Sequence, residues 1–308
     1  MTTLHQSGAY GHCWSYSWPG AVRRYVILAA IGASCLLGGL GSARADSFLR
    51  RQPDPRAATT SEAARRDAIA SIPFEHLDRD GRAKVTEVLH DAAAFRRLPT
   101  QVIDCDPHLF LLLVRHPDVA VNIWQVLEIS NLELRQIDSN RFELKEPTGT
   151  RLQAEFLYQN PEIHVVYGEG VYVGPIMGRP VHGRFLLVLR TGYVHETNGR
   201  HYVTARLDSF VQMHDRAPEL ITKLLQPLAG RTADFNFTQI VAFAGSLSRT
   251  AEVNHRGVQR LAGQLAGVQP ELRVKLAELA ADIARNTHGQ SASNVTGTSV
   301  LTSHESAH

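Results

Sequence analysis

The chain has 308 residues, of which 44% are hydrophobic and 20% are charged, so it can bury a sizeable core. Its first 45 residues hold three arginines and no acid, so the other 263 residues carry 29 basic and 30 acidic side chains. This balance excludes nucleic acid as the main partner, because a phosphate-binding surface needs an excess of positive charge.

Residues 1–45 have the three parts of a secretory signal peptide. Arg23 and Arg24 precede the apolar run Val26–Leu40, and Ala-Arg-Ala at 43–45 is a typical cleavage pattern. The 15-residue run is too short for a comfortable membrane span. We expect cleavage after Ala45 and a periplasmic or extracellular protein with no stable membrane anchor. General secretion and twin-arginine export both stay open.

Cys105 is the only cysteine of the expected mature chain, since Cys13 and Cys35 lie in the signal peptide. No internal disulfide and no cysteine-based metal cluster can then form. The neighbouring acids Asp104 and Asp106 disfavour a thiolate. We expect Cys105 to be buried and unreactive, with an intermolecular link or a reactive thiol as alternatives.

The region before residue 98 is interpreted as a linker followed by a helical segment. Residues 46–60 are assigned to the linker because Pro, Ala and Thr dominate them from 52 onward. Residues 61–97 are assigned to the helical segment. Within it, Ser61–Ala70 predicts a short helix, and Arg82–Phe95 has apolar residues at helical spacing.

One motif in this segment resembles an EF-hand calcium loop. Asp78, Asp80, Gly81 and Glu87 stand at the third, fifth, sixth and twelfth positions of such a loop. The first position is His76, although calcium prefers oxygen ligands. We therefore expect no calcium site, and expect Asp78 or Asp80 to cap the following helix.

Residues 98–252 predict one α+β domain. Leu98–Asp104 predicts a strand, and Asp106-Pro107 and His116-Pro117 predict the starts of two short helices. Alternating apolar residues then predict six strands, at about 132–137, 141–146, 150–159, 162–173, 181–195 and 200–213. The links between them are short, so consecutive strands must be antiparallel.

Helices and a polar tail are predicted for the rest of the chain. One helix is expected between Asp215 and Gly230, and a longer one over Asp234–Glu252. Residues 253–285 predict a helical hairpin, with helices near 255–266 and 270–285. Residues 286–308 are expected to be disordered because they have few apolar side chains to bury.

The order of these elements resembles the START-like helix-grip superfamily, which includes START domains and polyketide cyclases. Asp106-Pro107, His116-Pro117, the Asn198-Gly199 turn and the Phe237–Leu247 stripe carry the resemblance. It implies a curved antiparallel sheet of about seven strands that grips a C-terminal helix and encloses a cavity for lipid-like molecules. The chain departs from the family at Pro227–Gly230, where a continuous helix is usual. The family has no universal catalytic residues, so none is carried over.

The candidate ligand-binding residues combine a polar strand face with aromatic residues of the C-terminal helix. They are Tyr167, Glu169, Arg184, Tyr202, Arg206, Phe237 and Phe243. If the polar face looks inward, Arg206 and Tyr202 would hold an acidic head group, and Arg184 or Arg206 would pair with Glu169. If the opposite face of 200–213 lines the core, the polar face is merely solvated.

The sequence contains no catalytic or metal-binding signature. His182, His195, His201 and His214 lie at strand positions from which they could converge, but they form no compact ligand motif, so we expect no metal and no cofactor. The leading hypothesis is non-catalytic binding of an apolar or amphipathic small molecule. A structural or protein-interaction component of the cell envelope, with no ligand, is the alternative, and a cyclase- or hydrolase-type enzyme is a third.

Overall fold

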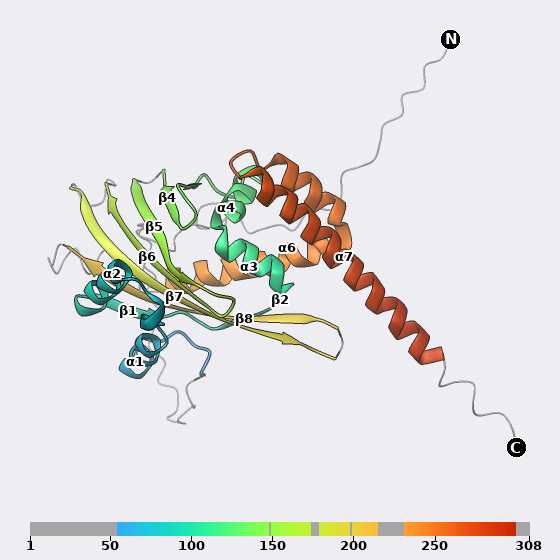
Figure 1. Cartoon of the computed structure of the whole chain (residues 1–308), viewed down its shortest axis with the longest axis horizontal. Coiled ribbons are helices and arrows are strands. Elements are labelled where there is room, and N and C mark those ends of the chain that lie inside the picture. The colour runs from blue at the N-terminus through green and yellow to red at the C-terminus, as the bar shows by residue number, and fades with distance from the viewer. Residues whose placement is uncertain (1–53, 148, 174–178, 198, 215–230, 300–308) are drawn as a thin grey trace, which may run out of the picture.

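A computed structural model describes residues 54–299, except 148, 174–178, 198 and 215–230 (Figure 1). The expected signal peptide and the helix expected before Gly230 lie outside the described residues. The helices are α1 (Glu62–Ala70), the 3-10 turn η2 (Phe74–His76), α2 (Arg79–His90), α3 (Pro107–Arg115), α4 (Pro117–Val126), α6 (Arg231–Gln264) and α7 (Pro270–Ser299). Within the described ranges, no helix combines the length and apolar content needed to cross a bilayer.

The strands form one curved antiparallel sheet, which confirms the predicted α+β fold class (Figure 1). They are β1 (Ala94–Arg97), β2 (Gln101–Asp104), β3 (Glu133–Gln136), β4 (Arg141–Lys145), β5 (Thr150–Gln159), β6 (Ile163–Tyr172), β7 (Val181–His195) and β8 (His201–Met213). The order is β1-β8-β7-β6-β5-β4-β3, and β2 also pairs with β8. The six strands predicted after residue 131 are therefore found, each with an antiparallel neighbour.

The start of the sheet differs from the sequence prediction. The helix expected over Arg82–Phe95 ends at His90, and Ala94–Arg97 pairs with β8 instead. The Phe95 ring packs 4.9 Å from the ring of Phe210, so tertiary contact overrides local helical spacing here. The described part of the expected linker is also docked, because Thr59 exchanges two backbone hydrogen bonds with Arg97.

Helices cover both faces of the sheet (Figure 1). On the concave face lie α3, α4 and α6, whose apolar side chains share one core with Val203 and Ala205 of β8. On the convex face lie α1 and α2, which pack on Leu186, Val188 and Phe210. The sheet is thus the middle layer, and α6 is the helix that the curved sheet partly surrounds.

The two C-terminal helices form the expected hairpin. Helix α6 is kinked at Asn254, whose side-chain oxygen accepts a hydrogen bond from the Gly257 amide at 3.0 Å. Beyond the kink, α6 packs on α7, which begins at Pro270. The tail expected to be disordered from 286 is instead helical as far as Ser299. No proline interrupts it, so a helix that is nucleated by packing can propagate.

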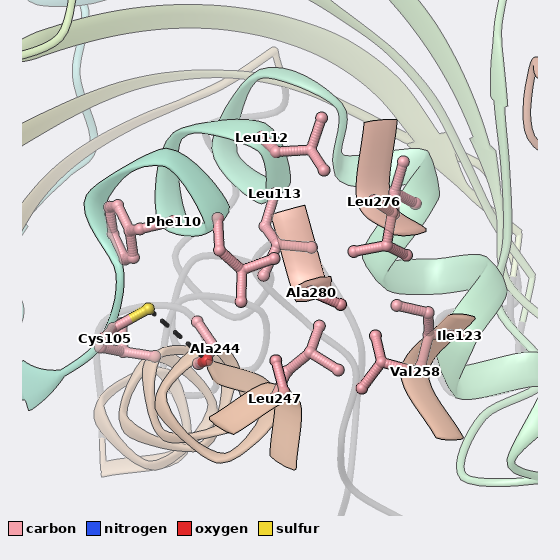
Figure 2. Close-up of a cluster of buried hydrophobic side chains, with 14 of the residues drawn as sticks. Cys105, Phe110, Leu112, Leu113, Ile123, Ala244, Leu247, Val258, Leu276 and Ala280 are labelled. Atoms are coloured by element: carbon pink, nitrogen blue, oxygen red, sulfur yellow. Dashed lines mark hydrogen bonds between the residues drawn. The ribbon is translucent and has the colours of Figure 1, made fainter. Parts of the chain in front are cut away.

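Cys105 lies in the core where α3, α6 and α7 meet (Figure 2). Its thiol is 1% exposed and donates to the Ala244 carbonyl at 3.6 Å. Burial, followed by the charge of Asp106, raises the pKa of this thiol far above its usual range. Cys105 is thus a buried thiol, as the sequence predicts.

Candidate functional site

A cavity of about 350 Å³ lies between the concave face of the sheet and helices α3, α4 and α6. Hydrophobic side chains form almost all of its wall, and the aromatic ones are Phe110, Trp124, Phe142, Phe156, Phe185, Phe237 and Phe243. Trp124 of α4 meets Phe243 of α6 edge to face, with ring centroids 5.5 Å apart. Apolar groups from both layers therefore line the cavity.

Glycines on β6 allow the cavity wall to form. A Cβ atom at Gly168 would lie 2.1 Å from the ring of Phe185, which lines the cavity. Any larger residue would push this ring off the sheet. Gly170 is equally restricted, because a Cβ atom there would lie 2.4 Å from the Arg151 carbonyl oxygen. The two glycines let neighbouring chain segments approach closely along the concave face.

Four polar residues line the cavity among the hydrocarbon groups: Glu155, His164, Ser209 and Asn236. Of these, Glu155 does not direct its side chain into the cavity, because its carboxylate accepts a hydrogen bond at 2.7 Å from Lys84 of α2 on the convex face. His164 is 0% exposed. Burial, and then the charge of Arg115, lower the pKa of His164 to about 4, so its imidazole is neutral at pH 7.

The structure divides the candidate residues between two faces of the sheet. Phe237 and Phe243 line the cavity. The other candidates are not in its wall and lie on the opposite, convex face: Tyr167, Glu169, Arg184, Tyr202 and Arg206. The second alternative therefore holds, in which Val203, Ala205 and Leu207 of β8 face inward. No acidic head group in this cavity can reach Arg206.

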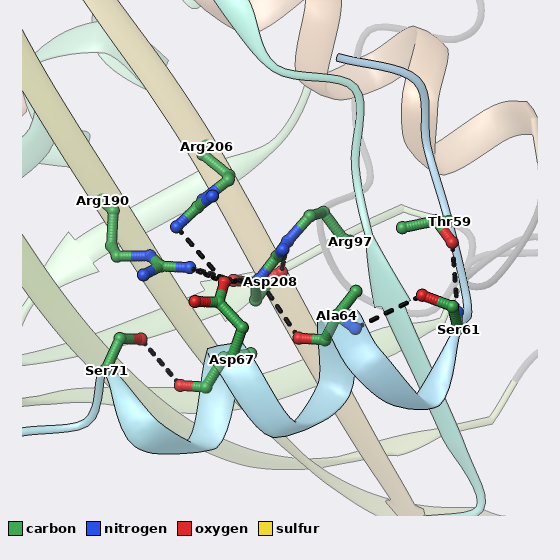
Figure 3. A network of polar contacts seen from close by, with 10 residues as sticks. Thr59, Ser61, Ala64, Asp67, Ser71, Arg97, Arg190, Arg206 and Asp208 are labelled. Carbon is green, nitrogen blue, oxygen red and sulfur yellow. Dashed lines mark hydrogen bonds and ion pairs between the residues drawn. The ribbon is translucent and has the colours of Figure 1, made fainter. Parts of the chain in front are cut away.

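The convex face is not merely solvated, contrary to that alternative. Asp208 is 0% exposed and accepts from Arg97 at 2.6 and 3.0 Å (Figure 3). Arg97 and Arg190 also donate to Asp67 of α1, at 2.7 and 2.5 Å. The hydrogen bond from Arg190 is the main reason that the pKa of Asp67 is lowered. Arg206 joins the same carboxylate at 3.4 Å, so this network attaches α1 to the sheet.

The pair predicted between Arg184 and Glu169 is present on the convex face. Arg184 Nε lies 3.6 Å from Glu169, and Arg184 also pairs with Glu87 of α2. Tyr167 donates its hydroxyl to Glu169 at 2.9 Å. A broad, open hollow of about 630 Å³ adjoins Glu169 and Arg184. This hollow is larger than the inner cavity, but its wall is charged and exposed, so it is the weaker site for an apolar ligand.

The calcium-like motif forms a helix start. Asp78 accepts from the Gly81 amide at 2.7 Å and caps α2, which begins at Arg79. The Arg82 side chain donates hydrogen bonds to the carbonyls of Leu77 and Glu75, so these two backbone oxygens already have a partner within the chain. The structure thus assigns Asp78 the capping role, one of the two that the sequence left open.

The strand-end histidines form two separate pairs. His195 stacks on His201 with centroids 4.3 Å apart, and His182 meets His214 at 6.4 Å. The pairs lie at opposite ends of β7 and β8, so the four rings do not converge. Across the described ranges, no cluster of three or more His, Cys, Asp or Glu could hold a metal ion.

Sequence reasoning missed His164, although its pattern was available. Alternation along β6 places His164 on the same face as Val166, Gly168 and Gly170. Tyr167 and Glu169 stand on the other face and carry more obvious chemistry. Choosing between the faces required knowing which one α6 covers.

Comparison with known proteins does not identify a family. No family model and no curated protein matches the chain. A crystal structure of a hypothetical protein from Helicobacter pylori is 11% identical, with a TM-score of 0.30 over 48% of this chain and 87% of its own. Dicamba monooxygenase with non-heme iron and dicamba is 12% identical, with a TM-score of 0.26 over 74% of this chain and 63% of its own. At these TM-scores, neither likeness informs the fold or the function of this chain.

Proposed function

We propose that this chain is an exported protein that binds one apolar small molecule in the cavity beneath α6, without chemical change. The hydrocarbon-walled volume of about 350 Å³ between the sheet and α6 is the observation that carries the proposal. Small-molecule sites typically have volumes of about 300–1,000 Å³ and mostly apolar linings. Transfer of an apolar molecule from water into such a space is favourable.

The polar residues of the wall support binding without catalysis. His164 is the only titratable side chain that the described residues place on the cavity side, because Glu155 alternates with Ala154 and its carboxylate lies on the convex face. Glu155 is paired with Lys84, and no hydrogen bond joins Ser209 to His164 as a nucleophile and base. The part of the wall that the structure describes therefore shows no activated group for a cyclase or hydrolase reaction.

Two sequence features agree with this proposal. The order of elements resembles helix-grip proteins, in which a sheet and a C-terminal helix enclose apolar ligands. The charged, apolar and small-residue parts of residues 1–45 support export. The proposed ligand would then be met in the periplasm or outside the cell.

The proposal is tested with 1-aminoanthracene, an uncharged three-ring dye whose fluorescence rises in apolar surroundings. Ala154 lines the cavity, so Ala154→Phe fills part of its volume. Gln153 is the adjacent residue of β5 but is exposed in the outer hollow. Gln153→Phe is therefore a matched control that adds the same ring to the opposite face.

We expect saturable binding of one dye per wild-type chain, at least about tenfold weaker in Ala154→Phe and unchanged in Gln153→Phe. Absence of saturable binding to the wild type would refute the proposal and favour a ligand-free structural role. If Gln153→Phe alone weakens binding, the dye occupies the outer hollow, and the inner cavity is not the site.

A further inference from the structure

His164 is a buried polar group whose hydrogen bonds are unmade within the described part of the chain. Its side chain is 0% exposed, and neither Nδ1 nor Nε2 has a hydrogen-bond partner. The Phe156 ring meets the imidazole edge to face, with centroids 6.3 Å apart. Phe156 also lines the cavity and offers no hydrogen-bonding atom.

A buried imidazole without partners destabilises a fold, and most buried polar side-chain atoms in proteins are paired. His164 lies in the wall of the cavity. Its two ring nitrogens have almost no solvent-accessible surface, so a molecule inside that space can supply their hydrogen-bond partner only when the imidazole or the neighbouring Phe156 ring turns. The site is thus mainly apolar, and His164 is one of a few polar residues, with Ser209 and Asn236, that can orient a ligand.

The charges around the cavity limit what that ligand can be. No lysine or arginine is part of the wall in the described ranges, so a ligand carboxylate would be desolvated without a counter-ion. Glu155 is the only acid among the described lining residues, and its carboxylate is bound to Lys84 of α2 on the convex face. An ammonium ligand would therefore find no counter-ion among the described residues of the cavity. Arg115 is close enough to affect His164 but is not among the lining residues.

We infer that the cavity takes an uncharged apolar molecule carrying a hydroxyl group, and that His164 is the residue that binds this hydroxyl. This inference rests on the proposed function and specifies its ligand class. A neutral imidazole has one N–H donor and one nitrogen acceptor, and a hydroxyl group can both donate and accept. The hydrocarbon part of the ligand would contact the aromatic wall.

The test compares naphthalene, 2-naphthol and 2-naphthoate as competitors of 1-aminoanthracene. They share one ring system and differ in the polar group. Each is measured on the wild type and on His164→Phe, which substitutes a hydrocarbon ring and removes no internal hydrogen bond. Leu187→Met is the control, because it changes the cavity wall at nearly constant volume and leaves His164 in place.

We expect the ratio of the naphthalene Kd to the 2-naphthol Kd to fall about tenfold in His164→Phe, the scale of one buried hydrogen bond. The ratio should stay unchanged in Leu187→Met. In the wild type, 2-naphthoate should bind at least about tenfold more weakly than 2-naphthol, because its charge has no partner.

Three results have different meanings. If no competitor and no dye binds the wild type, the proposed function itself fails. If naphthalene and 2-naphthol bind but the ratio of their Kd values is the same in His164→Phe as in the wild type, the cavity binds ligands and the role assigned to His164 is wrong. If 2-naphthoate binds more tightly than 2-naphthol, the ligand class is wrong.

A measurement on the wild type keeps the inference testable if His164→Phe does not fold. In protein labelled with ¹⁵N at histidine, 2-naphthol should shift the ring-nitrogen resonances of His164, and naphthalene should shift them much less. Equal shifts with both compounds would overturn the inference.

Discussion

Lowering the pH should reduce the free energy of unfolding by an amount that the pKa of His164 determines. Burial, and then Arg115, lower its folded-state pKa to about 4, below the ordinary value of 6.5. Between these two values, the unfolded chain binds a proton at this residue and the folded chain does not. The contribution of His164 to the free energy of unfolding is therefore fully present above pH 6.5, and it is lost as the pH falls toward 4. From pH 7.5 to pH 5, the loss is about 2 kcal/mol.

Urea unfolding at pH 7.5, 6 and 5 measures this effect, with the fluorescence of buried Trp124 as the signal. The comparison is between the wild type and His164→Phe, because the carboxylates titrate alike in both proteins. We expect the wild type to lose about 2 kcal/mol more than the variant between pH 7.5 and pH 5. Equal losses in the two proteins would show that His164 titrates normally, and would contradict its buried, uncharged environment.

Three further changes test the packing. Asp208→Ala should lower the free energy of unfolding by about 3 kcal/mol in urea titrations, because it leaves the charge of Arg97 buried without its main partner. A loss below about 1 kcal/mol would mean that the pair is solvated. Gly170→Ala should cost about 2–3 kcal/mol, since its Cβ atom would lie 2.4 Å from a backbone oxygen, and an unchanged melting temperature would contradict this close approach. A chain that ends at residue 269 loses Leu276 and Ile283 from the core, so it should melt at a lower temperature than a chain that ends at 299. Equal melting temperatures would mean that α7 is not docked.

Local patterns were sufficient for most of the element boundaries. The six strands after residue 131 differ from their predicted limits by no more than one or two residues, because alternation and turn residues are properties of neighbouring positions. Asp106 and Pro107 likewise specify the start of α3 through a side-chain cap and a fixed backbone angle. Short links made the antiparallel order unavoidable.

Strand β1 could not be predicted from the residues next to it in the sequence. Phe95 stands at helical spacing from the residues before it, yet it belongs to β1 because the edge of β8 supplies hydrogen bonds and the ring of Phe210 supplies a contact. Both partners lie more than a hundred residues away in the sequence. The same kind of contact draws Thr59 of the expected linker onto β1.

The candidate site depended on a choice between two faces that only the tertiary structure makes. Along β6, sequence alternation separates His164 from Tyr167 and Glu169, but either set satisfies a strand with one face buried. Docking of α6 on the concave side places His164 in the cavity wall, while α2 covers Tyr167. The sequence by itself thus determined which residues share a face, because alternation is local. The assignment of each face to the cavity or to the outer helices came from packing between segments far apart in the chain.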